Sequence, residues 1–279
     1  MTSSTFYGPN TVRYDPSLGT GNVRAVGSYK YNESASGPNT DHGMIYQGPV
    51  SGGGTWTQID ANPLVSSGTL LDTIAHSTMG NLVVGNYDTS LATGHAFIYD
   101  MSASPATAWK ELNPTGSLSV TAYGIWQNGG SSSTHYTITG GFSDLNHGGV
   151  DEGYVVDYDT ATGAFTHLKT YNFNNMPVKS LISHFDGITA TANGYNLTGE
   201  YVDYDHGGKT GAFFASIARL PDGSFSAADW TDIAFPNADR TTGNTVIGNN
   251  VLGVYAPGLN SDVSSYLATV FNPNSLLHS

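Results

Sequence analysis

The chain of 279 residues contains no cysteine, which excludes disulfide bonds, thiolate metal sites and cysteine nucleophiles. Cationic side chains are also scarce: 9 Lys and Arg stand against 22 Asp and Glu, giving a formal net charge of -13. Nucleic-acid backbones and anionic membrane surfaces need Lys and Arg to replace their counterions. The sequence therefore predicts that neither is a partner.

Long apolar runs and leader features are missing as well. No stretch of about 18 apolar residues occurs, so no membrane span is predicted. The first ten residues lack the basic start and apolar segment of a signal peptide. Few Lys, no Cys and abundant Gly, Ser, Thr, Asn and Tyr favour a secreted or cell-surface protein, any leader lying outside this chain. We expect a monomer.

Familiar catalytic motifs and helical patterning are absent too. The sequence has no Gly-x-Ser-x-Gly elbow, P-loop, His-Glu-x-x-His or dinucleotide fingerprint. No segment shows a sustained 3.6-residue apolar period. The 17 Tyr, 11 Phe and 4 Trp nevertheless supply enough apolar area for a folded core. A folded, strand-rich protein is therefore expected.

An internal repeat organises the chain. Two small or apolar residues followed by Gly-x-aromatic occur five times, at 25–29, 83–87, 138–142, 197–201 and 251–255. Successive repeats are spaced by 58, 55, 59 and 54 residues, measured between Gly27, Gly85, Gly140, Gly199 and Gly253. The glycine either lets neighbouring sheets approach closely or marks a β-bulge. Near-equal repeats fill the chain and leave no room for a second domain.

Each repeat contains further strand signals. A polar-then-β-branched segment precedes the glycine motif and an apolar segment follows it. Four repeats add an aromatic-led strand, beginning at Trp56, Trp109, Phe165 and Trp230. Four short strands per repeat predict an all-β fold, a five-bladed β-propeller with four antiparallel strands per blade. The blades are expected at about 8–62, 70–115, 121–172, 184–236 and 242–279. A β-solenoid is the alternative, although its repeats are much shorter.

Ring closure has two possible solutions. The outer strand of the fifth blade is either 275–279 or the N-terminal segment 3–7. Only four residues separate Phe6 from Asn10, a short path from the outer edge of a blade to the axis. The C-terminal segment is therefore favoured.

Two segments resemble a known repeat. Gly94-His95-Ala96-Phe97-Ile98-Tyr99 and Ala122-Tyr123-Gly124-Ile125 are similar to the HAF repeat of bacterial extracellular proteins. Degenerate copies occur at 41–46 and 211–214. The resemblance implies propeller-like β repeats and an extracellular location, and it supplies no catalytic residues.

The predicted site lies where the first strands begin. In a propeller these strands line the axis, and ligands usually bind on the face where they are entered. The entry positions form a predicted ring of Asn10, Asp72, Tyr123, Asp186 and Asn244. Asp72 and Asp186 are candidate catalytic acid and base, with His184 assisting. The structural alternative is that these side chains hydrogen-bond loop backbone.

Histidines in the loops between second and third strands are further ligand-binding candidates. His42, His147 and His206 each follow Asp or Asn, and the last two precede Gly-Gly. Such groups could hold a divalent metal if they converged, but Asx-His-Gly is also ordinary turn chemistry. No cofactor is predicted.

Three functions are compatible with these features. The first is recognition of a small molecule or glycan, without turnover, in one central pocket of a secreted propeller. The second is an enzyme, a hydrolase, lyase or cyclase that uses Asp72, Asp186 and His184. The third is a surface module that binds proteins. The repeats have diverged too far for five equal peripheral sites, which favours one central site.

Overall fold

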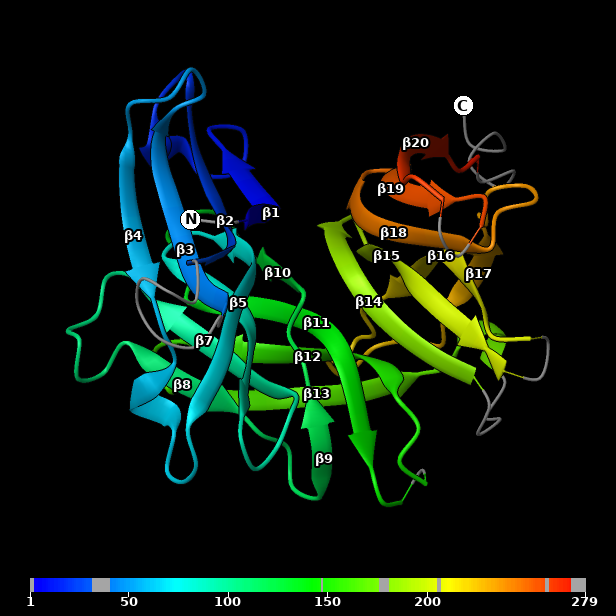
Figure 1. Ribbon diagram of the computed structural model, residues 1–279, viewed down its shortest axis with the longest axis horizontal. Helices are drawn as coiled ribbons and strands as arrows, with labels where there is room; N and C mark the ends of the chain where they lie inside the picture. Colours follow the sequence, from blue (N-terminus) through cyan, green and yellow to red (C-terminus); the bar gives the residue numbers. More distant parts are fainter. Residues whose placement is uncertain are drawn as a thin grey trace. The chain divides into compact units, whose positions relative to one another are not determined.

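A computed structural model describes residues 3–31, 41–146, 148–175, 181–204, 207–258 and 261–271 (Figure 1). Within these ranges the chain forms twenty β-strands and three short 3-10 helices, and no α-helix. The predicted all-β class is confirmed. No helix in the described part of the chain is long and apolar enough to cross a membrane.

The first two repeats each form a four-stranded antiparallel sheet in chain order. The first sheet contains β1 (Ser3–Thr11), β2 (Asn22–Lys30), β3 (Asp41–Pro49) and β4 (Thr55–Ile59). The second contains β5 (Leu70–Met79), β6 (Leu82–Thr89), β7 (His95–Asp100) and β8 (Trp109–Leu112). The 3-10 helices η1 (Pro16–Leu18) and η2 (Asn62–Leu64) lie in the connections.

The third sheet has an interrupted first strand. It contains β10 (Gly124–Gln127), β11 (His135–Asp144), β12 (Glu152–Asp159) and β13 (Ala164–Tyr171), and β9 (Ser117–Val120) also pairs with β11. The helix η3 (Phe173–Asn175) follows.

The last sheet joins two antiparallel sets of strands. The first set is β14 (Leu181–Ala190), β15 (Gly194–Asp203), β16 (Lys209–Ala218) and β17 (Asp229–Asp232). The second is β18 (Arg240–Ile247), β19 (Asn250–Ala256) and β20 (Ser264–Thr269). One parallel bridge, from Thr210 to Arg240, links them. The first three repeats therefore form one sheet each and the last two share a sheet, while a closed five-bladed ring stays a prediction.

One proposed route to ring closure is wrong. Residues 3–7 belong to β1, which pairs with β2 from Ser3 opposite Lys30 to Thr11 opposite Val23. This segment is the first strand of the first sheet and does not supply an outer strand to the fifth repeat. The predicted start of the first blade, residue 8, also falls inside this strand. The favoured segment, 275–279, lies outside the described residues.

The repeated glycine faces a β-bulge. In four repeats the pairing of first and second strands shifts directly after the glycine's partner, at Gly27, Gly85, Gly199 and Gly253. A Cβ at any of these four positions would lie 1.8–2.0 Å from a carbonyl oxygen of the first strand. Any larger side chain is therefore sterically excluded, and the bulge interpretation of the repeat is confirmed.

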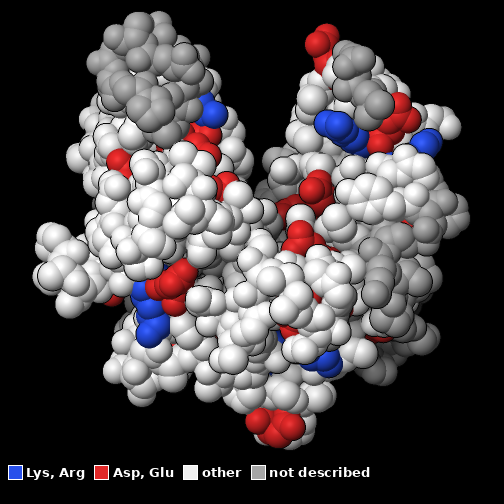
Figure 2. Space-filling view, turned by 60° about the horizontal axis from the view of Figure 1, so that its bottom comes forward, with Lys and Arg blue, Asp and Glu red and all other residues white. Residues whose placement is uncertain are grey.

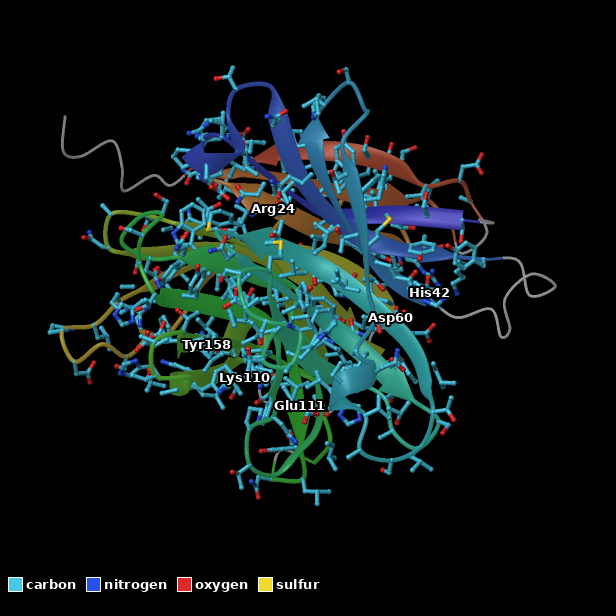
Figure 3. All side chains as sticks on the ribbon, turned by 90° about the vertical axis from the view of Figure 1, so that its left-hand side faces the viewer. Arg24, His42, Asp60, Lys110, Glu111 and Tyr158 are labelled. Atoms are coloured by element: carbon cyan, nitrogen blue, oxygen red, sulfur yellow. The ribbon has the colours of Figure 1, made fainter. Side chains whose placement is uncertain are left out.

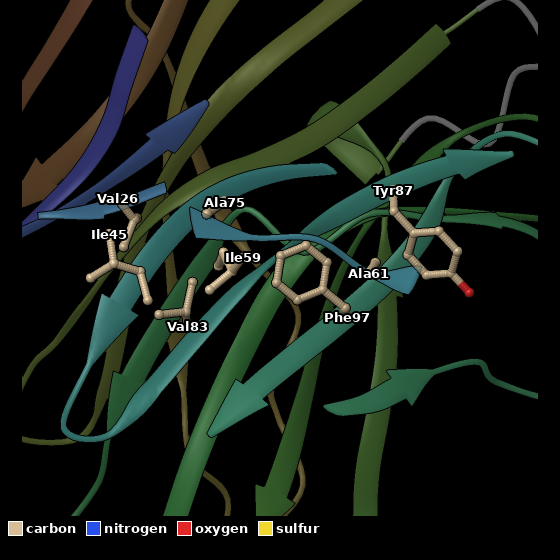
Figure 4. Close-up of a cluster of buried hydrophobic side chains, with 8 residues drawn as sticks. All are labelled: Val26, Ile45, Ile59, Ala61, Ala75, Val83, Tyr87 and Phe97. Carbon is tan, nitrogen blue, oxygen red and sulfur yellow. The ribbon is translucent and has the colours of Figure 1, made fainter. Parts of the chain in front are cut away.

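The contacts divide the chain into two compact units. Unit 1 comprises residues 1–149 and 155–166, and unit 2 comprises 150–154 and 167–279. A buried cluster in unit 1 unites side chains of the first two sheets: Val26, Ile45, Ile59, Ala61, Ala75, Val83, Tyr87 and Phe97 (Figure 4). In unit 2, Phe185, Phe213 and Trp230 pack with ring centroids 4.9–5.8 Å apart. Each unit thus has its own apolar core.

Candidate functional site

The bulges define one equivalent position in each repeat. In four repeats the strand pairing skips one residue, which is Tyr7, His76, Asp186 or Asn244. Tyr123 holds the same position in the third repeat, because the next residue, Gly124, pairs with Thr139, directly before the repeated glycine. We call these five residues the bulge positions. Three of them, Tyr123, Asp186 and Asn244, belong to the ring expected from the sequence.

The other two members of the expected ring are out of register. Asn10 lies three residues after Tyr7, and Asp72 lies four residues before His76. Asn10 is buried; its Oδ1 accepts a hydrogen bond from the Thr11 backbone at 2.9 Å. Asp72 Oδ1 accepts one from the Asp41 backbone at 2.8 Å. The prediction that Asn10 and Asp72 are equivalent to the other ring members is therefore wrong. Strand pairing, and not the local sequence, sets the register of these positions.

A charged group surrounds the bulge of the fourth repeat. His184 and Glu200 are direct cross-strand partners in β14 and β15, with His184 Nδ1 4.0 Å from Glu200 Oε1. His184 Nε2 lies 3.5 Å from Asp151 Oδ2. Asp186, the bulge residue, follows His184 by two positions. We call His184, Asp186 and Glu200 the carboxyl set; all its members belong to unit 2.

Burial disfavours the ionised form of both carboxyls of the set. Burial, reinforced by the negative charge of Glu200, raises the pKa of Asp186 well above its usual range. Burial also raises the pKa of Glu200, while electrostatic interactions with His184 and Arg240 lower it in part. Two interacting carboxyls of this kind retain a proton to higher pH than an ordinary carboxyl does. The set can therefore offer a proton donor and an anionic acceptor together.

The scaffold does not require this charged group. The pairs equivalent to His184–Glu200 are Thr5–Ser28, Ile74–Asn86 and Thr242–Val254, none of them ionisable at the second position. Glu200 was missed from the sequence because it occupies the variable position of the Gly-x-aromatic motif. Its signal is that it alone, among Ser28, Asn86, Gly141 and Val254, can ionise as an acid.

Aromatic side chains occupy the bulge positions of unit 1. The ring centroids of Tyr7 and His76 are 4.8 Å apart, and those of His76 and Tyr123 are 4.5 Å apart. His76 Nε2 lies 2.6 Å from Asn86 Oδ1. Burial lowers the pKa of His76 to about 4, so its imidazole is neutral at neutral pH. We call Tyr7, His76 and Tyr123 the aromatic set.

The histidines of the HAF-like segments pair with acidic residues. His42 Nδ1 lies 3.1 Å from both carboxylate oxygens of Asp60 (Figure 3). His95 Nδ1 lies 3.1 Å from Glu111 Oε1, and its ring stacks on Tyr87 at 4.9 Å. Because both histidines contact an acidic side chain in the same way, a structural role accounts for them. A ligand-binding role for His42 stays a prediction.

The remaining site residues predicted from the sequence are Asn244, His147 and His206. Asn244 is exposed, and its Oδ1 accepts a hydrogen bond from Thr242 Oγ1 at 2.9 Å. His147 and His206 lie outside the described residues. In the part of the chain that the structure describes, no three His, Asp or Glu side chains are grouped to hold a metal ion. Asp and Glu are scattered over the face in Figure 2, where Lys and Arg are few.

Comparisons with known proteins add only distant structural likeness. No family model and no curated protein matches the chain. A solved structure described as a glycoside hydrolase has a TM-score of 0.47 at 11% identity, covering 96% of this chain and 86% of that protein. Another, described as a complex of BT0996 and RGII, has a TM-score of 0.46 at 11% identity, covering 97% and 87%. Likeness at this level establishes neither a family nor an activity.

Proposed function

We propose that the chain binds a small neutral glycan at the carboxyl set of unit 2. The observation that carries this proposal is the ionisable His184–Glu200 pair beside Asp186, which the equivalent positions of three other repeats lack. Partly buried ionisable groups are costly to desolvate, so their presence where the fold does not require them points to a functional site. The charge-poor, Cys-free composition supports an extracellular place for such binding.

The chemistry of the set suits sugar hydroxyls. An ionised carboxylate accepts hydrogen bonds from hydroxyl groups, and a protonated carboxyl or a histidine N–H donates to their oxygens. Asp186, Glu200 and His184 provide both kinds of group within one site. The nearby Asp151 adds negative charge, which disfavours sulfated, phosphorylated or uronic-acid ligands. A neutral glycan is therefore the class of ligand with the best complementarity.

A glycan array followed by calorimetry tests the proposal. We expect the purified chain to bind neutral glycans and to exclude acidic ones. Replacing Glu200→Gln removes the acceptor charge and should weaken binding of the best array glycan at least about tenfold. Asp229→Asn is the matched control, because Asp229 is an exposed carboxylate on β17 of the same unit. Absence of neutral-glycan binding, or equal affinities of the two variants, would overturn the proposal.

A second candidate is hydrolysis of the bound glycan. The specific observation in its favour is the raised pKa of Asp186 beside the acceptor Glu200, which is the arrangement that a general acid needs. In that reaction Asp186 would protonate the leaving oxygen as its bond to the sugar carbon breaks. Glu200 would take a proton from the water molecule whose oxygen bonds to that carbon. Asp186→Asn should then abolish product formation and retain glycan binding. The variant Asp72→Asn tests separately whether Asp72, the acid/base partner expected from the sequence, takes part in the reaction. Glycan binding by the wild type without any product would leave recognition as the function.

A further inference from the structure

The aromatic set is held together by the backbone of unit 1. Tyr7 comes from β1, His76 from β5, and Tyr123 directly precedes β10. A Cβ at Gly8 would lie 2.4 Å from the carbonyl oxygen of His76, so β1 passes directly against the bulge of β5. This close approach places rings from three different sheets in contact. The set is therefore preorganised before any ligand arrives.

The aromatic set is also uncharged. Nε2 of His76 lies 2.6 Å from Asn86 Oδ1, and with that oxygen as acceptor the proton resides on Nε2 while Nδ1 keeps a lone pair. Burial keeps the imidazole neutral above a pKa of about 4. An apolar surface with hydrogen-bonding edges and no formal charge favours a ligand of the same character.

Core packing alone does not explain these rings. Tyr7 exposes 41% of its surface, so part of its ring is open to a ligand. The same bulge position holds Asp186 and Asn244 in the fourth and fifth repeats, so the scaffold accepts small polar side chains there. The fold therefore does not require an aromatic ring at this position, and the exposed part of Tyr7 is available for recognition of a ligand.

We propose that the aromatic set binds the apolar face of a neutral sugar ring, which stacks on Tyr7. A pyranose presents C–H groups on one face and hydroxyls at its edge, matching a tyrosine ring flanked by polar atoms. This inference rests on the proposed function only for the class of ligand. Its residues belong to unit 1, and those of the carboxyl set belong to unit 2.

Titration with simple methyl glycosides tests this surface directly. Methyl β-D-glucopyranoside, methyl β-D-galactopyranoside and methyl β-D-xylopyranoside are added to the full chain while aromatic NMR resonances are followed. We expect saturable shifts at Tyr7 and His76 with at least one of the three sugars. Tyr7→Ala should weaken that binding at least about tenfold, whereas Tyr7→Phe, which keeps the ring, should retain it. Tyr204→Ala is the control, because Tyr204 is 60% exposed in unit 2.

The outcomes separate the two proposals. Unshifted Tyr7 resonances with all three sugars, or equal affinity of Tyr7→Ala and wild type, would overturn the aromatic surface even if array glycans bind through Glu200. Loss of binding in Tyr7→Ala with unchanged methyl-glycoside binding in Glu200→Gln would establish the aromatic surface by itself. A folding defect in Tyr7→Ala is detected by its circular dichroism, and the Tyr7 shifts of the wild type then decide the question.

Discussion

The bulge positions of the two units share a backbone device and differ in their side chains. In unit 1 burial lowers the pKa of His76, and in unit 2 burial raises the pKa of Asp186. Both shifts have one cause, because burial disfavours whichever form carries the charge. Neutral histidine has lost its proton, whereas neutral aspartic acid has kept it. Burial therefore lowers the pKa of histidine and raises the pKa of aspartic acid. The repeat therefore fixes the backbone and leaves the chemistry at the bulge free to diverge.

The shared backbone device should show the largest effects. Gly85→Ala in unit 1 and Gly199→Ala in unit 2 each place a Cβ within 2.0 Å of a carbonyl oxygen. We expect each to lower the free energy of unfolding by about 3 kcal/mol or more, because the bulge must rearrange. Gly52→Ala is the control: it has a φ of 95° and open space around it, so only about 1 kcal/mol of backbone strain is expected. Urea denaturation measures all three. A Gly199→Ala variant as mild as Gly52→Ala would contradict the common bulge.

The lowered pKa of His76 should make the protein less stable in acid. Its pKa falls from 6.5 to about 4 on folding, so the unfolded chain binds more protons between these values. Stability from this group is complete above pH 6.5 and is lost as pH falls towards 4, by at most about 3 kcal/mol. Urea denaturation from pH 4 to 7 should show a shallower acid limb for His76→Gln than for wild type. Identical slopes would show that His76 titrates normally.

The carboxyl set should have the opposite pH dependence. The folded chain holds the Asp186 proton above the ordinary value of 3.8, so this contribution to stability is present at low pH and is lost as pH rises through the raised pKa. Asp186→Asn removes the titration and should raise the melting temperature by a few degrees at pH 8, with little change at pH 4. Thermal unfolding at the two pH values measures the difference. A lower melting temperature of the variant than of the wild type at pH 8 would contradict a raised pKa of Asp186.

The paired histidines should give the smallest effects. His42 and His95 each contact an acidic residue and a tyrosine ring, so His42→Gln and His95→Gln should each cost about 1 kcal/mol of stability. Neither substitution should alter glycan binding. Denaturation and calorimetry measure both quantities. A loss of affinity confined to His42→Gln would instead support the ligand-binding role expected from the sequence.

Much of the fold follows from one steric requirement. Only glycine fits opposite the bulge, so its spacing in the sequence predicted where each sheet lies. The site was harder to predict, because polar-then-β-branched segments recur near both Asn10 and Asp72 and mask the true bulge residues, Tyr7 and His76. Their register depends on which residues of the next strand they face, and the local sequence does not show this. Glu200 was overlooked because it stands at the variable position of the motif, although it alone among the five residues there is acidic.

The titration of Asp186 and Glu200 tests the central claim most directly. Carbon-13 NMR of the side-chain carboxyls, with and without the best neutral glycan from the array, reports the ionisation of both groups. We predict a pKa of Asp186 well above 3.8 in the free protein and a further change of both carboxyl signals when the glycan binds. Ordinary carboxyl pKa values for both residues, unchanged by the glycan, would contradict a binding site at the carboxyl set.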